Sequence, residues 1–167
     1  MRMANEFVRQ GPRESAGALV PMADRIARAF GVQADEVAVL ALSQDGRALR
    51  FLLPTGLQKI GQINMTSNSS LAARTARDGK AEIINRFSVV PHASVFESVR
   101  LKSEPGDPIQ KIMSVALTHH KKIVGVIQIS RKAKNNELAG ADFTPKELKL
   151  LSAVGVILGP CVFLVGG

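Results

Sequence analysis

The stretch MSVALTHHKKIVGVIQIS, residues 113–130, decides the fold. The segment that enters it, residues 109–118, alternates and is rich in strand-forming residues, and residues 123–130 are the most strand-like segment of the chain. Between them, the polar run HHKK at 119–122 predicts a turn. Two strands joined so closely form a hairpin, so we expect an antiparallel sheet at the centre of the protein.

Further strands are expected upstream of this hairpin. Residues 37–42 (VAVLAL) and 49–53 predict a second hairpin around the turn signal SQDG, and Pro54 ends it. Residues 54–68 are rich in Gly, Pro, Asn and Ser and predict a loop. Residues 81–84 predict one more short strand, which brings the expected sheet to five or six strands.

Three helices are predicted around these strands. Apolar residues from Leu19 to Phe30 share one helical face, and because proline fits best in a first turn, Pro21 places the start of this helix near residues 17–20. A short helix over 71–77 follows a serine N-cap. The last helix starts at the capping box Thr144–Glu147, with Phe143 and Leu148 as its hydrophobic staple.

The order of these elements excludes the strict strand–helix alternation of a parallel sheet. We therefore predict an α+β fold, a central antiparallel sheet of five or six strands with the N- and C-terminal helices packed on one face. The chain has 167 residues, which suits one domain. We expect a flexible N-terminal arm at 1–14 and a single domain at 15–167.

Three stretches are similar to the GAF domain, a small-ligand sensor fold related to PAS domains. They are SSLAARTARDGKAEII at 69–84, the hairpin at 113–130, and DFTPKELKLLSAV at 142–154. The resemblance covers roughly residues 15–160. These motifs are structural patterns without catalytic residues, so they bear on the fold more than on function.

The resemblance implies a ligand pocket between the sheet and the loops that cover it, with residues 85–108 as a lid. The large apolar candidates for this pocket have a plain core role as their alternative, because such side chains are buried anyway. Ser114 is the one candidate with a hydroxyl group. In apolar surroundings this hydroxyl needs a hydrogen-bond partner, and a backbone carbonyl would also serve. The ligand-binding candidates are Phe51, Ile63, Met65, Asn85, Phe87 and Ser114.

Enzymatic chemistry is not expected. Members of the family that attach bilin or reduce methionine sulfoxide use cysteine, and the one cysteine here, Cys161, lies late in an apolar helix. The fragment Asn85-Arg86-Phe87 resembles part of the signature of cyclic-nucleotide-binding members, but the Asp-Glu pair is missing. We interpret His119-His120 as solvated turn residues, and we name no metal ligand and no cofactor.

The chain is basic, with a formal net charge of +8 and a sequence pI of about 10.2. Three basic clusters, 121–122, 131–134 and 146–149, are expected near turns at one edge of the sheet, where they would bind phosphates without sequence preference. No recognition helix or stacking platform accompanies them, so we favour a solvated basic surface over nucleic-acid binding. A third interpretation is an anionic ligand near the lid, held by backbone N–H groups at residues 69–71.

The C-terminal helix is unusually apolar, since residues 150–167 carry no charge. Such a helix is about 27 Å long, near the lower limit for spanning a bilayer. We favour burial at a homodimer interface through the terminal helices, as the resemblance implies, over a membrane tail. One cysteine and no apolar N-terminal segment predict a cytoplasmic protein.

The function predicted from the sequence is a non-catalytic sensory or regulatory module. It would bind a small ligand under the 85–108 loop and signal through a dimer or partner contact by a shift in populations. The alternative is a dimeric adaptor that binds no ligand. A non-specific nucleic-acid binder is less favoured.

Overall fold

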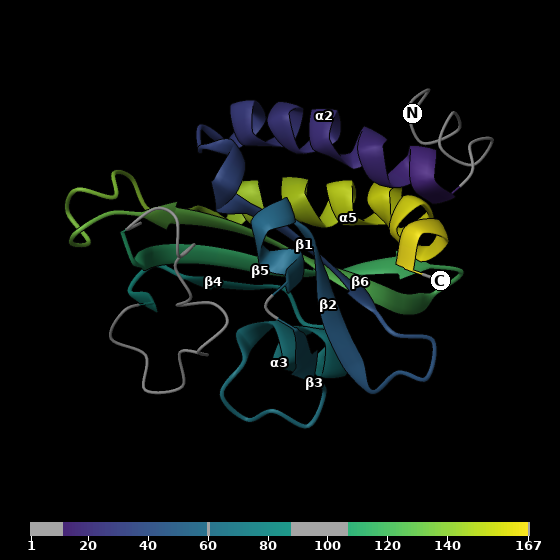
Figure 1. Ribbon diagram of the computed structural model, residues 1–167. Coiled ribbons are helices and arrows are strands. Elements are labelled where there is room, and N and C mark those ends of the chain that lie inside the picture. Colours follow the sequence, from purple (N-terminus) through teal and green to yellow (C-terminus); the bar gives the residue numbers. More distant parts are fainter. Residues whose placement is uncertain (1–11, 60, 88–106, 167) are drawn as a thin grey trace.

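A six-stranded antiparallel sheet forms the centre of the protein (Figure 1). The computed structural model describes residues 12–59, 61–87 and 107–166. The strands are β1 (Val37–Leu42), β2 (Ala48–Leu53), β3 (Gln62–Asn64), β4 (Glu82–Ile84), β5 (Ile109–His119) and β6 (Lys122–Lys132), in the spatial order β3-β2-β1-β6-β5-β4. The helices are α2 (Pro12–Phe30), α3 (Leu71–Asp78) and α5 (Pro145–Gly166), with the short 3-10 turns η1 (Ala34–Glu36) and η2 (Thr55–Lys59). The predicted α+β class is confirmed.

The strand β1 lies in the middle of the sheet and is buried on both faces. It pairs with β2 on one side and with β6 on the other, where Val37 lies opposite Ile129 and Ala41 opposite Gly125. Residues 37, 39 and 41 face α2 and α5, and residues 38, 40 and 42 face α3. The run VAVLAL is therefore apolar throughout, because both faces of this strand are covered.

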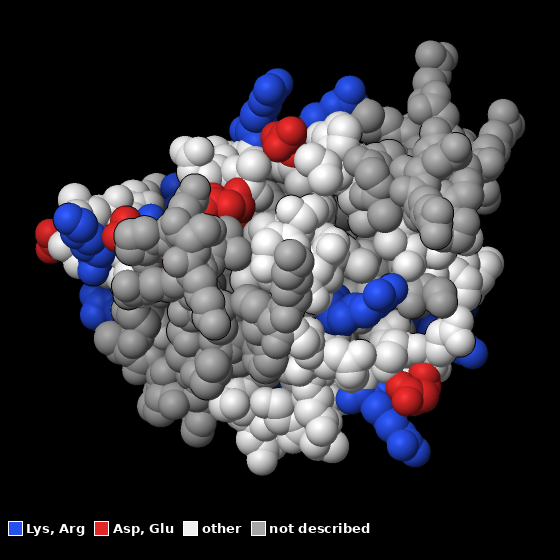
Figure 2. All heavy atoms as spheres, in the orientation of Figure 1, with Lys and Arg blue, Asp and Glu red and all other residues white. Residues whose placement is uncertain are grey.

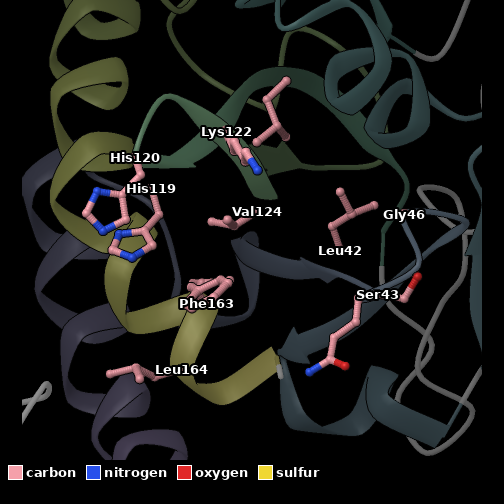
Figure 3. A pocket seen from close by; sticks show the side chains of 12 residues that line it. Leu42, Ser43, Gly46, His119, His120, Lys122, Val124, Phe163 and Leu164 are labelled. Carbon is pink, nitrogen blue, oxygen red and sulfur yellow. The ribbon is translucent and has the colours of Figure 1, made fainter.

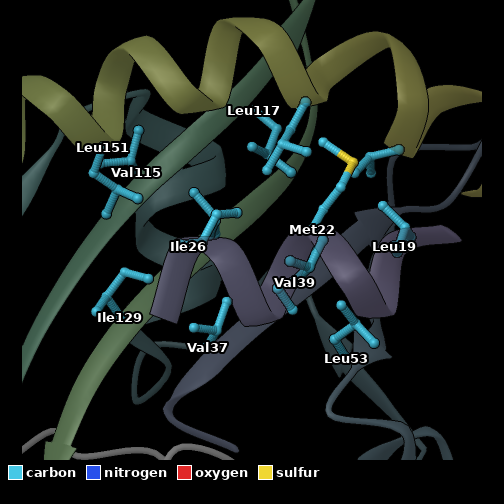
Figure 4. Close-up of a cluster of buried hydrophobic side chains, with 14 of the residues drawn as sticks. Leu19, Met22, Ile26, Val37, Val39, Leu53, Val115, Leu117, Ile129 and Leu151 are labelled. Atoms are coloured by element: carbon cyan, nitrogen blue, oxygen red, sulfur yellow. The ribbon is translucent and has the colours of Figure 1, made fainter. Parts of the chain in front are cut away.

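The helices α2 and α5 pack side by side on one face of the sheet (Figure 1). Between them and the sheet lies the main hydrophobic core, in which Met22 and Ile26 of α2 meet Val115 of β5 and Leu151 of α5 (Figure 4). The approach of α5 to β5 is close because a glycine faces the strand. A Cβ added at Gly159 would stand 1.6 Å from the carbonyl oxygen of Thr118.

The helix α3 covers part of the opposite face. The Ser70 side chain caps it by accepting a hydrogen bond from the Ala73 N–H at 3.1 Å, as the sequence predicts. Arg74 of α3 binds Glu82 of β4 through two hydrogen bonds, of 3.0 and 2.8 Å. This pair and the buried alanines of α3 hold the helix against the sheet.

Three details differ from the sequence predictions. The helix α2 begins at Pro12, and Pro21 lies inside it on the exposed side, so residues 12–14 of the predicted arm are helical. The segment 54–68 is not wholly a loop, since it contains η2 and the edge strand β3. The expected lid at 85–108 lies mostly outside the described residues, as does any helical turn at 92–98.

Candidate functional site

The face of the sheet that carries α3 contains a small internal space, which we call the η2 cavity. It lies between Phe51 and Gln128 on the sheet and Leu57 of η2, and its volume is about 30 Å³. This volume is roughly that of one water molecule in the liquid and far below the 300–1,000 Å³ of ordinary ligand pockets. As bounded by the described residues, the η2 cavity therefore has room for about one water molecule.

A buried polar network lies beside the η2 cavity. Ser114 of β5 is fully buried, and its hydroxyl oxygen lies 2.7 Å from that of Thr75 on α3. The Gln128 side-chain N–H₂ donates to the Ser114 oxygen at 3.2 Å, and the Thr75 hydroxyl donates to the Leu71 carbonyl at 2.9 Å. The network therefore ties α3 to β5 and β6 and supplies Ser114 with the partner that its burial requires.

Further polar groups lie at the η1 end of the η2 cavity. The backbone N–H of Lys132 donates to a Glu36 carboxylate oxygen at 2.6 Å, and the Lys132 ammonium donates to the Asp35 carbonyl at 3.2 Å. The other Glu36 carboxylate oxygen accepts from the Gln33 N–H at 2.8 Å. These bonds anchor η1 to the end of β6, so the carboxylate of Glu36 is already used by the backbone.

Five of the six predicted ligand-binding residues lie on the α3 side of the sheet. Phe51 and Ile63 are buried in one apolar cluster, against which Met65 packs, and Phe51 also lines the η2 cavity. Phe87 is buried in a neighbouring cluster, and Ser114 is in the polar network. The structure thus places these five residues near one face, with the large apolar ones packed as core.

Asn85 is placed differently. Its amide group makes two hydrogen bonds to the backbone of Phe143, donating to the carbonyl at 3.1 Å and accepting from the N–H at 2.9 Å. Its own carbonyl accepts from the Asn136 side chain at 2.6 Å. Phe143 belongs to the core beneath α5, so Asn85 connects the end of β4 to the segment that leads into that helix.

Thr75 and Gln128 complete the buried network, and the sequence analysis did not select them. Gln128 is nevertheless conspicuous in the sequence, because it is a polar residue inside the apolar strand IVGVIQIS. A buried amide in such a strand needs a partner. For Thr75 the signal is weaker, since a threonine in a short polar helix is unremarkable.

The position of the cysteine bears on thiol chemistry, and the positions of the possible ligand residues bear on metal binding. Cys161 is fully buried, and burial raises the pKa of its thiol, which disfavours the reactive thiolate. In the described residues no group of three or more His, Cys, Asp and Glu side chains is placed to hold a metal ion.

The prediction of a solvated turn does not hold for His119. This residue ends β5, and its ring centroid lies 4.9 Å from that of Phe163.

The basic clusters do not share one edge of the sheet, which corrects the sequence interpretation. β6 lies between β1 and β5, and the pairs at 121–122 and 131–132 lie at opposite ends of its eleven residues, about 33 Å apart. Arg131 is also engaged, with its guanidinium 4.6 Å from the Phe143 ring centroid and 3.9 Å from the Glu147 carboxylate. In Figure 2 the Lys and Arg side chains of the described residues form separate groups on the face shown.

Comparison with solved structures identifies the fold. The GAF domain of a phosphoenolpyruvate-protein phosphotransferase from Acinetobacter aligns over 96% of this chain and 88% of its own, with a TM-score of 0.66 and 14% identity. A methyl-accepting chemotaxis protein, residues 122 to 287, aligns over 97% and 95%, with a TM-score of 0.69 and 10% identity. A type II free methionine-R-sulfoxide reductase from Thermoplasma acidophilum aligns over 90% and 94%, with a TM-score of 0.63 and 12% identity.

The chain has the GAF fold. The GAF domains among the similar structures confirm the predicted resemblance, and at such low identity they establish the fold alone. The sequence itself matches no protein-family model and no curated protein.

Proposed function

We propose that this chain is a non-catalytic regulatory module that pairs with a second copy through α5 and responds to a small ligand on the α3 face of the sheet. The proposal places the protein in the cytoplasm. Its support comes from the outer surface of α5, from the strand β5, whose residues contact both faces of the sheet, and from the burial of Cys161.

The observation that carries the proposal is an exposed apolar row on α5. Leu150, Val156 and Ile157 are 51%, 63% and 39% exposed, and Ala153 lies between them on the same side of the helix. We call these four residues the α5 row. Large apolar side chains gathered on one outer face typically mark a contact surface. A second copy of the same helix would cover them in a two-fold arrangement.

A membrane is the competing partner for α5. By length and composition, residues 145–165 form a helix long and apolar enough to cross a bilayer, with a mean hydropathy of 2.2, and 33% of its most apolar window is buried. Insertion would require α5 to leave the sheet. Leu151, Leu158 and Val162 would then lose their core contacts, and the sheet would expose Val115 and Leu117 to water. A second copy covers the α5 row without that loss.

The strand β5 offers a route from the ligand face to the dimer face. Ser114 points into the network under α3, while its neighbours Met113 and Val115 belong to the core under α5. A ligand that shifts β5 from the α3 side would therefore move the surface on which α5 lies. Such coupling needs only a difference in ligand affinity between two packings of α5.

A ligand-free dimeric adaptor is the second candidate, and the small η2 cavity favours it. The two candidates differ in one outcome, since only the sensor retains or binds a small molecule. Enzymatic activity of the reductase kind has weak support. The chain has a single cysteine, Cys161, and it is a residue of α5 that is buried in the core between this helix and the sheet.

The test of the pairing surface is a charge placed in the α5 row. We expect the variant Ile157→Glu to sediment as a monomer at a concentration at which the parent protein is a dimer, because pairing would bury the new carboxylate. Analytical ultracentrifugation measures this directly. The matched control is Leu138→Glu, which changes a leucine that is 68% exposed in the segment between β6 and α5.

The proposal predicts that the control remains a dimer and that both variants keep the circular dichroism spectrum of the parent. Equal sedimentation of the two variants and the parent would contradict the placement of the interface on α5.

A further inference from the structure

A second, larger cavity lies at the other end of β6 from the η2 cavity. We call it the hairpin-end pocket, because it lies where the β1–β2 and β5–β6 hairpins approach the C-terminal turns of α5 (Figure 3). Its volume is about 690 Å³. That is within the range of 300–1,000 Å³ that holds small organic molecules.

The pocket exists because the two hairpins separate. The pairing of β1 with β6 ends at Ala41 and Gly125, although both strands continue. The pairing of β5 with β6 is also irregular here, since Leu117 lies opposite Gly125 and Thr118 opposite Ile123. Val124 is left without a partner in the ladder, as in a β-bulge. Leu42 and Val124 thus border an opening in the sheet instead of pairing across it.

The pocket has apolar walls. Leu42, Ile123 and Val124 come from the strands, and Val162, Phe163 and Leu164 come from α5. Phe163 is 53% exposed, although it is a large aromatic residue of a helix that packs on the sheet. Its ring lies toward the interior of the pocket in Figure 3, with His119 beside it. An apolar molecule placed here would cover this ring.

The polar groups of the pocket are basic on one side. His119, His120 and Lys122 line it, and none of the twelve lining residues is acidic. The nearest acidic residue on the opposite hairpin is Asp45, whose carboxylate already accepts hydrogen bonds from Ser43 at 2.6 Å and from the Arg47 N–H at 3.1 Å. The turn also holds His120 and Lys121 at φ values of 51° and 63°, where glycine or asparagine is usual.

We propose that the hairpin-end pocket binds a small amphipathic anion, an acyl or aryl carboxylate. The apolar chain of the ligand would lie against Phe163, Val124 and Leu42, and its carboxylate would lie beside Lys122 and His120. The proposal rests on the volume, the apolar walls and the ammonium group of Lys122 in a lining that has no acidic residue. It is independent of the ligand expected on the α3 face.

The test uses octanoate as the probe and 1-octanol as its uncharged counterpart. Both are titrated into the ¹⁵N-labelled 167-residue chain, and amide shifts are followed by TROSY spectra. We expect saturable shifts at Gly46, His119, Val124 and Phe163 with octanoate, and weaker binding of octanol. The variant Lys122→Gln should raise the Kd for octanoate by up to about fivefold, as expected for an exposed charge pair. Phe163→Ala should raise it by about tenfold.

The controls are Lys134→Gln and Leu138→Ala, which make the same kinds of change at exposed positions away from the pocket. They should leave the Kd unchanged, and all variants should keep the parent's thermal unfolding midpoint. Equal binding of octanol and octanoate together with no effect of Lys122→Gln would overturn the proposal. Shifts confined to Phe51 and Leu57 would also overturn it, because they would place the ligand in the η2 cavity and support the proposed sensor site instead.

Discussion

Individual side chains hold the α3 face together through buried hydrogen bonds. The network of Thr75, Ser114 and Gln128 joins residues that are 39 and 14 positions apart in the chain. A buried hydroxyl or amide that loses its partner costs about 1–3 kcal/mol, more than the net contribution of an intact hydrogen bond. Removing one hydrogen-bonding side chain of this network should therefore lower the free energy of unfolding by more than the few atoms removed would suggest.

We expect Ser114→Ala to lower the free energy of unfolding by about 1–3 kcal/mol, because the Gln128 amide loses its partner in a buried site. Urea denaturation measures the change. The matched control is Ser152→Ala on α5, whose hydroxyl donates to the Leu148 carbonyl at 3.0 Å in a half-buried position. Equal losses for the two variants would show that the network has no special role.

We expect His119 to make the stability of the fold depend on pH. Burial lowers its pKa below the ordinary value of 6.5, and the positive charge of neighbouring His120 adds to this effect. The unfolded chain therefore binds a proton more readily than the folded chain does. The contribution of neutral His119 to the free energy of unfolding is fully present above pH 6.5. It is lost as the pH falls through the lowered pKa of this residue in the folded chain.

The prediction is that His119→Gln reduces the fall in stability between pH 7.5 and pH 5 relative to the parent protein. Urea midpoints at the two pH values give the comparison. His120→Gln serves as the second variant, because His120 is the neighbouring histidine and its side chain is exposed. An unchanged pH dependence in His119→Gln would contradict the role of its burial.

The elements of the fold meet through backbone contacts as well as side chains. The helix α5 lies on β5 with two glycines toward the strand, and they differ in how much room they leave. A Cβ at Gly155 would be 3.1 Å from the Ala116 carbonyl oxygen, whereas at Gly159 it would be 1.6 Å from that of Thr118. An alanine at position 159 therefore cannot be accommodated unless the helix moves. An alanine at position 155 needs only a small adjustment of its neighbours.

We expect Gly159→Ala to destabilise the protein by more than 2 kcal/mol, an order-of-magnitude estimate for a core overpacked against backbone. Gly155→Ala should be close to neutral, since alanine's helix propensity is better by about 1 kcal/mol and offsets the tighter contact. Thermal and urea unfolding of the two variants give the comparison. If Gly159→Ala proves as stable as Gly155→Ala, then α5 does not lie against β5 as described.

Elements with a strong local pattern could be predicted from the sequence. The hairpin at 113–130, the capping box at Thr144 and the short helix behind Ser70 depend on residues close together in the chain. Strand β3 could not be predicted, because three residues give no usable alternation and pairing with β2 decides their conformation.

The candidate site was only partly predictable, because its contacts also join residues that are far apart in the chain. Ser114 was selected because its hydroxyl needs a partner, but that partner, Thr75, is supplied by tertiary packing. Asn85 was selected by resemblance, and its hydrogen bonds to Phe143 could not be foreseen. The hairpin-end pocket depends on where β1 leaves β6, which no local sequence pattern indicates.

The molecule as a whole is built on a sheet whose two faces are covered by different helices. On one side, α3 and the network close the sheet. On the other side, α2 and α5 bury the main core and leave the α5 row exposed. The proposed regulatory function uses this division, because it assigns pairing and ligand binding to two distinct surfaces.

The most direct test is a native mass spectrum of the 167-residue chain, purified without detergent. We predict a species of twice the chain mass of 17.9 kDa, and a further mass increment would identify a retained ligand. A dimer without added mass would support the adaptor alternative. A soluble monomer at micromolar concentration would contradict pairing through α5.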